Sequence, residues 1–152
     1  WSRWRPMSER KFPLFLNHTG REVWLFGGGA VALRRAKTLL AFGPNLTVVA
    51  PELDPAFLEL PVRLERRAYA PGQMNRPFLV LAATGDAAVN RAITAEARSK
   101  GAWANNASDR RDCDFFFPAV ILKEDITVGL TGDGQDHSAV RRAAAAIREM
   151  KL

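Results

Sequence analysis

Residues 23–32 have the sequence VWLFGGGAVA, and this stretch decides the fold. The apolar run 23–26 is short and is ended by three glycines, which predicts a buried strand followed by a turn. Apolar residues then recur at helical spacing from Val31 to Phe42, and Gly43-Pro44 ends that helix. The stretch therefore predicts a strand, a tight glycine turn and a helix.

The same alternation of strand and helix continues toward the middle of the sequence. Further strands are predicted over 46–50, 62–66, 78–83 and 102–105, and helices over 54–60 and 87–100. Strands that alternate with helices form a parallel, doubly wound sheet with right-handed crossovers. The expected fold class is therefore α/β, of the Rossmann-like type in which a glycine turn follows the first strand.

The last third of the sequence has a different pattern. Two apolar runs, 115–122 and 126–131, are separated by Lys-Glu-Asp, which predicts an antiparallel hairpin. A helix is expected from Ser138, as its N-cap, to Met150. We therefore expect three parts: a flexible segment over 1–11, an α/β domain over 12–114, and a hairpin-and-helix appendage over 115–152.

Composition excludes several classes of protein. The 152 residues, 47% hydrophobic and 25% charged, are typical of one globular domain and not of a disordered chain. The net charge is +6, but the basic residues are dispersed and not interleaved with aromatic ones, so nucleic-acid binding is not favoured. No apolar run has the ~20 residues of a membrane span. The single cysteine, Cys113, favours a reducing compartment, so we expect a cytoplasmic protein.

The glycine turn has the pattern of a dinucleotide-binding site, G-x-G-x-x-A, between a strand and a helix. Gly27 allows the tight turn, Gly29 lets the backbone approach a pyrophosphate, and Ala32 allows close helix packing. The N–H groups of Ala30 and Val31 then face the anion. The alternative is a plain strand-to-helix turn without a ligand.

Two further positions bear on the choice of cofactor. Glu52 follows the second strand and can reach a ribose hydroxyl, although an exposed loop acid is an equal alternative. No arginine immediately follows that strand to bind a 2′-phosphate, which favours NAD over NADP. Thr84 follows the strand 78–83 and is expected on the nicotinamide side; alternatively, it only begins a turn.

Several blocks, in this order, resemble the precorrin-2 dehydrogenase family, the dehydrogenase module of siroheme synthases. They are GGGAVALRRA at 27–36, VVAPE at 48–52, AATGD at 82–86 with Val89-Asn90, NASD at 106–109, and CDFFFPA at 113–119. The resemblance runs from about Phe12 to Leu152. It implies hydride transfer from precorrin-2 to NAD, giving sirohydrochlorin for siroheme or cobalamin. Some members also insert ferrous iron, and longer members continue into a helical domain beyond the point where this sequence ends.

The resemblance also assigns roles to individual residues. Ala30 and Val31 would cover the pyrophosphate, and Pro51 and Glu52 would border the adenosine ribose. Asp109 would be the catalytic carboxylate, able to accept the proton that the substrate sheds after losing a hydride.

A second alignment of the acid stays open. If Asn105 rather than Asn106 matches the family asparagine, Ser108 takes the catalytic position and Asp109 stands next to it. Asn106 and Ser108 are otherwise assigned to the substrate. So are Arg110 and Arg111, because guanidinium groups match the carboxylates of a tetrapyrrole. The alternative for these arginines is a solvated basic surface.

The remaining candidate residues favour structural roles. Asp136 and His137 could bind a metal or act as an acid–base pair, but are expected to shape the turn and cap the last helix. The two histidines and Cys113 form no metal motif. The apolar runs at 115–117 and 120–122 are expected to pack on a second subunit, giving a homodimer; the alternative is an interior strand of one subunit. Two alternatives to a simple dehydrogenase remain: a bifunctional dehydrogenase and ferrochelatase, or a non-catalytic sensor of NAD or tetrapyrrole.

Overall fold

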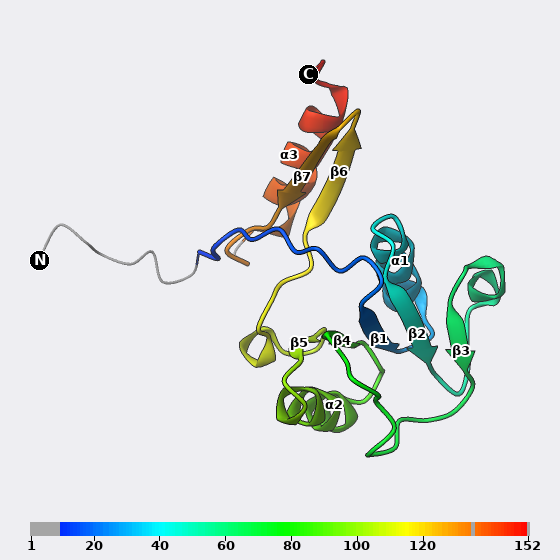
Figure 1. Ribbon diagram of the computed structural model, residues 1–152. Helices are drawn as coiled ribbons and strands as arrows, with labels where there is room; N and C mark the ends of the chain where they lie inside the picture. Colours follow the sequence, from blue (N-terminus) through cyan, green and yellow to red (C-terminus); the bar gives the residue numbers. More distant parts are fainter. Residues whose placement is uncertain (1–9, 135, 152) are drawn as a thin grey trace, which may run out of the picture. The chain divides into compact units, whose positions relative to one another are not determined.

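The computed structural model describes residues 10–134 and 136–151 (Figure 1). The described residues form two compact units, one of residues 17–116 and one that combines those before residue 17 with those after residue 116. The predicted flexible segment 1–11 lies outside the described residues except for Arg10 and Lys11.

The first unit is built on a five-stranded parallel sheet, which confirms the α/β prediction. Its strands are β1 (Glu22–Phe26), β2 (Asn45–Val49), β3 (Arg63–Glu65), β4 (Leu79–Ala82) and β5 (Trp103–Asn106). The spatial order is β3-β2-β1-β4-β5, so the chain changes direction between β1 and β4. Open α/β sheets bind ligands at such a switch point, beyond the carboxyl ends of the strands.

Helices connect and cover these strands. The helices α1 (Ala30–Leu40) and α2 (Ala87–Ser99) pack on β1 and on β4 and β5, respectively. Two 3₁₀ turns, η1 (Pro55–Glu59) and η2 (Arg110–Asp112), follow β2 and β5. The predicted helix over 54–60 is therefore a short 3₁₀ turn.

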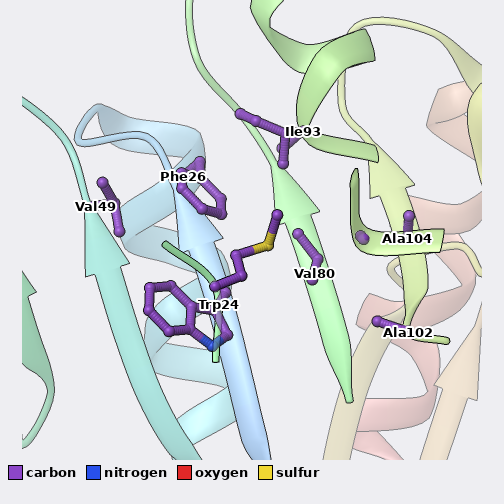
Figure 2. Close-up of a cluster of buried hydrophobic side chains, with 10 residues drawn as sticks. Trp24, Phe26, Val49, Val80, Ile93, Ala102 and Ala104 are labelled. Atoms are coloured by element: carbon purple, nitrogen blue, oxygen red, sulfur yellow. The ribbon is translucent and has the colours of Figure 1, made fainter. Parts of the chain in front are cut away.

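The core lies on both faces of the sheet. Trp24 and Phe26 of β1 belong to a cluster with Val80 of β4 and Ile93 of α2 (Figure 2). The intervening Leu25 is also buried, on the opposite face, because successive strand residues alternate. Burial on both faces explains why the strands are continuous apolar runs.

The crossover from β3 to β4 contains no helix, and Glu96 of α2 anchors it instead. The Glu96 carboxylate accepts hydrogen bonds from the Tyr69 hydroxyl at 2.6 Å and the Gly72 amide at 3.2 Å. Burial, together with the carboxylate of Glu96, raises the pKa of Tyr69 to about 12. The segment therefore covers the core without secondary structure of its own.

The second unit is a two-stranded antiparallel sheet with one helix. Its elements are β6 (Ala119–Lys123), β7 (Ile126–Leu130) and α3 (His137–Glu149). Ile121 and Ala144 are its only buried hydrophobic residues in the described part of the chain, whereas Phe12, Phe15 and Leu122 are exposed. This unit therefore has a much smaller core than the first.

Two details of this unit differ from prediction. The first hairpin strand begins at Ala119, not at Phe115, because Pro118 has no N–H to give to a ladder and the Phe115 carbonyl accepts from the Asn105 side chain. The N-cap of α3 is Asp136 rather than Ser138, since its carboxylate accepts from the Ser138 amide at 3.0 Å. This confirms the capping role expected for Asp136. Within residues 10–134 and 136–151, no helix has the length and apolar character to cross a membrane.

Candidate active site

The glycine turn after β1 is held against the loop after β4. Gly27 has φ +141°, and its amide donates to the Val49 carbonyl at 3.0 Å. A Cβ on Gly27 would lie 2.4 Å from the Ala83 carbonyl oxygen. Ala32 is buried, and its Cβ would lie 3.4 Å from that added Cβ, so the first turn of α1 packs closely against Gly27. Both residues hold the geometry that the G-x-G-x-x-A pattern requires.

Gly28 is equally constrained, although the pattern leaves its position free. A Cβ on Gly28 would lie 2.0 Å from the Glu52 carbonyl oxygen, and the Gly28 carbonyl accepts from the Asp54 amide at 2.8 Å. The loop after β2 is thus fixed by its backbone, while the Pro51 and Glu52 side chains are exposed. Their contact with a ribose stays a prediction.

Gly29 differs from both neighbours. A Cβ there would meet nothing within 4 Å. Gly29 is the N-cap of α1, no side chain caps this helix, and its first turn contains no acidic residue. In contrast, α2 and α3 begin with the capping carboxylates of Asp86 and Asp136.

The start of α1 therefore has the chemistry of an anion site. The amides of Ala30 and Val31 precede the first intrahelical bond, from Leu33 to Gly29, and both residues are exposed. Uncapped amides at the positive end of a helix dipole favour a negative group. The open space at Gly29 fits a pyrophosphate, the part of NAD that the pattern predicts here.

Thr84, at the end of β4, is held by a helix residue. Its hydroxyl donates to the side-chain oxygen of Asn90 at 2.6 Å and accepts from the Asp86 amide at 3.3 Å. Thr84 thus does begin a turn, and its neighbour Ala83 lies against Gly27. Its contact with nicotinamide stays a prediction.

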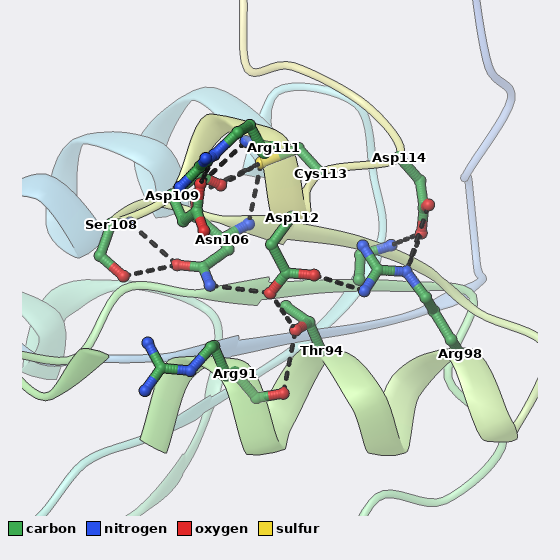
Figure 3. A network of polar contacts seen from close by, with 11 residues as sticks. Arg91, Thr94, Arg98, Asn106, Ser108, Asp109, Arg111, Asp112, Cys113 and Asp114 are labelled. Carbon is green, nitrogen blue, oxygen red and sulfur yellow. Dashed lines mark hydrogen bonds and ion pairs between the residues drawn. The ribbon is translucent and has the colours of Figure 1, made fainter. Parts of the chain in front are cut away.

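The loop after β5 is built from interlocked polar side chains (Figure 3). Asn106 is buried; its side-chain oxygen accepts from the Ser108 amide at 2.9 Å and the Ser108 hydroxyl at 2.7 Å. Its amide nitrogen donates to Asp112 at 2.9 Å. Asn106 therefore shapes the loop, and the substrate roles predicted for Asn106 and Ser108 stay predictions.

Asp112 joins this loop to α2. Its carboxylate accepts from the Thr94 hydroxyl at 2.6 Å and from Arg98 at 2.5 Å. Burial alone would raise the pKa of Asp112, but bonds from Asn106, Thr94 and Arg98 lower it below its usual value. Sequence reasoning missed Asp112, because a carboxylate inside a polar loop carries no spacing signal.

Asp109 begins the turn η2. Its carboxylate accepts from the Arg111 amide at 3.0 Å, and about a third of the side chain, 32%, is exposed. The Arg111 guanidinium lies 3.5 Å from the same oxygen but is 93% exposed, so solvent screens this pair. Arg110 is also exposed at the start of η2. The loop thus presents a carboxylate and two guanidinium groups close together in sequence.

Asn105, the other candidate for the family asparagine, faces away from this network. It accepts from Arg35 of α1 at 2.7 Å and donates to the Phe115 carbonyl at 2.9 Å. Successive strand residues point to opposite faces, so Asn105 and Asn106 serve different sides of the sheet. In the part of the chain that the structure describes, no group of His, Cys, Asp and Glu residues could hold a metal ion.

The chain is similar to several known proteins. Residues 14–119 match the model of a family described as "Putative NAD(P)-binding". Siroheme synthase of Chromobacterium violaceum is 40% identical over 127 residues, which are 81% of this chain and 27% of that protein. Siroheme synthase 2 of Aeromonas hydrophila is 38% identical over 131 residues, 85% of this chain and 28% of that protein.

A solved structure is also similar. SirC, a precorrin-2 dehydrogenase, superposes with a TM-score of 0.76 at 26% identity, covering 90% of this chain and 69% of that one. The chain thus spans less than a third of the siroheme synthases that it matches and about two thirds of SirC. These similarities confirm the resemblance to siroheme synthases and precorrin-2 dehydrogenases that the sequence motifs indicate.

Proposed function

Because the chain belongs to this NAD(P)-binding family, we propose that it is an NAD-dependent dehydrogenase that oxidises precorrin-2 to sirohydrochlorin. The observation that carries the proposal is the uncapped helix start at Gly29, at the same sheet edge as the loop of Asp109. Similarity to SirC supports the reaction class.

The residues of the glycine turn would hold the cofactor. Amides of Ala30 and Val31 would bind the pyrophosphate, with Gly29 leaving room for it. Pro51 and Glu52 would border the ribose at the end of β2. When bound, NAD supplies the hydride acceptor, and the protein supplies position. The neighbouring turn at Thr84 would orient the nicotinamide end.

The loop after β5 would hold the substrate, a tetrapyrrole rich in carboxylates. Arg110 and Arg111 are exposed there, and guanidinium groups pair well with carboxylates. The oxidation removes one hydride, which leaves on the cofactor, and one proton. Asp109 would accept that proton, its carboxylate being fixed by the Arg111 amide.

The second unit supports the dimer that the sequence predicts. A two-stranded sheet is marginal in water unless more surface covers it. Here only Ile121 and Ala144 are buried hydrophobics among the described residues of the unit, while Leu122 and Ile126 are exposed. We propose that a second copy of the chain covers this surface, and that the protein acts in the cytoplasm.

The test is anaerobic turnover of precorrin-2 with NAD and then with NADP, following NADH and sirohydrochlorin absorption, with ferrous iron added last. NAD-dependent product is the expected result, and metal uptake would add the chelatase. Asp109→Ala should lower kcat by about 100-fold, the usual size of general-base catalysis, with NAD still bound.

Asp125→Ala, an exposed acid between β6 and β7, is the matched control and should keep full turnover. Unchanged turnover in Asp109→Ala would remove Asp109 as the base and return attention to Ser108. Tight NAD binding without any product would instead favour the sensor.

A further inference from the structure

Asn90 is a completely buried polar residue in the first turn of α2. Its side-chain oxygen accepts from the Thr84 amide at 3.0 Å and the Thr84 hydroxyl at 2.6 Å. Its side-chain nitrogen donates to the Thr84 carbonyl at 3.2 Å and to the Ser108 hydroxyl at 3.1 Å. An asparagine amide has two donors and two acceptor sites, so its capacity is fully used.

Three of these bonds go to Thr84, just after β4, and two of the three are to its backbone. Asn90 pairs with both the N–H and the C=O of Thr84, as a neighbouring strand would. The next residue back, Ala83, is the one whose carbonyl lies against Gly27. The Asn90 side chain therefore holds the turn that borders the glycine turn.

The fourth bond reaches the loop after β5. The Ser108 hydroxyl accepts this bond from Asn90. The same hydroxyl donates to the Asn106 side-chain oxygen at 2.7 Å (Figure 3), and Asp109 is the next residue along the chain. One side chain thus ties the turn after β4 to the loop that contains the predicted base. A backbone bond from the Ala107 amide to the Ala82 carbonyl, at 2.9 Å, already joins the ends of β5 and β4, and Asn90 adds a side-chain link two residues beyond Ala82 and one beyond Ala107.

The three bonds to Thr84 have a structural reason, because an apolar residue at this position would leave the N–H and C=O of Thr84 without these partners. The bond to the Ser108 hydroxyl does not share that reason, since it reaches a different loop. Burying the Asn90 amide costs free energy unless every bond is made, so the loop after β5 must keep Ser108 in place. The bond to Ser108 therefore indicates a role at the site.

We propose that Asn90 is a positioning residue that sets the distance between the nicotinamide-binding turn and the loop of Asp109. The inference rests on the proposed function for its catalytic consequence. It places Asn90 outside the reacting groups, acting through Thr84 and Ser108. Misplacing a reacting group by about 1 Å can cost about 100-fold in rate.

The first experiment compares Asn90→Ala with Asn45→Ala in the full chain. Asn45 also donates one side-chain bond to a backbone carbonyl, that of Gly20, at the opposite edge of the sheet. Asn90→Ala should lower kcat by about 10- to 100-fold, because the misplaced loop slows chemistry. Its NAD affinity should stay within about threefold, because the pyrophosphate site lies on a different strand. Asn45→Ala should change neither.

Asn90→Asp covers the case in which the alanine variant does not fold. The carboxylate keeps the side-chain volume and the two bonds accepted from Thr84, and it loses the two donated to the Thr84 carbonyl and the Ser108 hydroxyl. It should therefore lower kcat without leaving the cavity that alanine leaves. A folded Asn90 variant with unchanged kcat would overturn the proposal, as would a weakened NAD affinity with kcat intact.

A double-variant cycle with Ser108→Ala separates positioning from a direct role of Ser108. If the two side chains act through one bond, the double variant should lose no more kcat than the worse single variant. Additive losses would show that Ser108 acts independently and would contradict the proposed link.

Hydrogen exchange distinguishes this inference from the proposed function. Asn90→Ala should speed amide exchange over 107–111 relative to Asn45→Ala, whether or not the protein turns over precorrin-2. If the wild type does not turn over precorrin-2 but exchange over 107–111 still speeds up in Asn90→Ala, the proposed function is wrong and the link from Asn90 to Ser108 is supported. Unchanged exchange over 107–111 would overturn the link itself.

Discussion

The turn after β1 and the loop after β5 lie at the same edge of the sheet and are built in opposite ways. The first is made of backbone: Gly27 and Gly28 pack against carbonyls of other loops, and Gly29 faces open space. The second is made of side chains, with Asn106 and Asp112 bonded from several directions.

The difference follows from what each region is expected to bind. A pyrophosphate is recognised by amides that every residue has, so the turn needs small residues and no side-chain cap. A proton acceptor must be one particular side chain in one place, so its loop needs neighbours that hold it. The turn is therefore sensitive to added atoms, and the loop to removed ones.

The largest expected effect comes from adding one carbon to the turn. In Gly28→Ala, the new Cβ would lie 2.0 Å from the Glu52 carbonyl oxygen, so backbone must move. We expect a loss of about 3 kcal/mol in the free energy of unfolding, at the upper end for overpacking. Urea unfolding measures it. A stability within about 0.5 kcal/mol of the wild type, the range of harmless surface changes, would contradict this packing.

The sequence predicted the backbone-built region well. The strand, glycine turn and helix follow from local rules: an apolar run, three glycines, and helical spacing closed by Gly43. The parallel sheet follows from the alternation of such units. The predicted start of the hairpin at Phe115 was wrong, because the apolar run of phenylalanines suggested a strand that Pro118 does not allow to begin before Ala119.

The side-chain-built region could not be predicted in the same way. The bonds of Asp112 come from Thr94 and Arg98, which are 18 and 14 residues away in sequence. In the sequence, Asn90 stands out only as part of a family motif, since no local pattern indicates that its side chain reaches Ser108. The constraint on Gly28 was missed for a similar reason, because Glu52 belongs to another loop.

The intermediate effect comes from removing a charge from the loop. Asp112→Asn keeps the shape but faces the donors of Asn106, Thr94 and Arg98 with an amide. Losing hydrogen bonds to a charged, partly buried group should cost about 2 kcal/mol at pH 7. The side chain is 20% exposed, so solvent screens it only in part.

The pH dependence sharpens this prediction. The pKa of Asp112 in the folded state is lowered, so the unfolded chain binds its proton more readily. The stabilisation is therefore complete well above the unfolded pKa of about 3.9 and is lost as pH falls through the folded pKa. The difference in the free energy of unfolding between wild type and Asp112→Asn should narrow below about pH 5. Asp125→Asn, in the exposed turn between β6 and β7, should unfold with the same free energy as the wild type at every pH. If the stability lost in Asp112→Asn does not change with pH, the loss comes from packing and not from the charge.

The smallest effect tests the turn where it is open. Gly29→Ala adds the same single carbon as Gly28→Ala, one residue away, but into space where nothing lies within 4 Å. Gly29 has φ −90°, which alanine adopts without strain, so stability should change by less than about 1 kcal/mol even at an N-cap. NAD affinity should nevertheless fall by about tenfold, roughly 1.4 kcal/mol, because the methyl group occupies the approach to the amides of Ala30 and Val31. Calorimetric titration with NAD beside urea unfolding gives both quantities. Loss of stability without loss of NAD affinity would show that Gly29 is needed for packing, as Gly28 is. It would contradict the prediction from their geometry that Gly28 serves the fold and Gly29 serves cofactor binding.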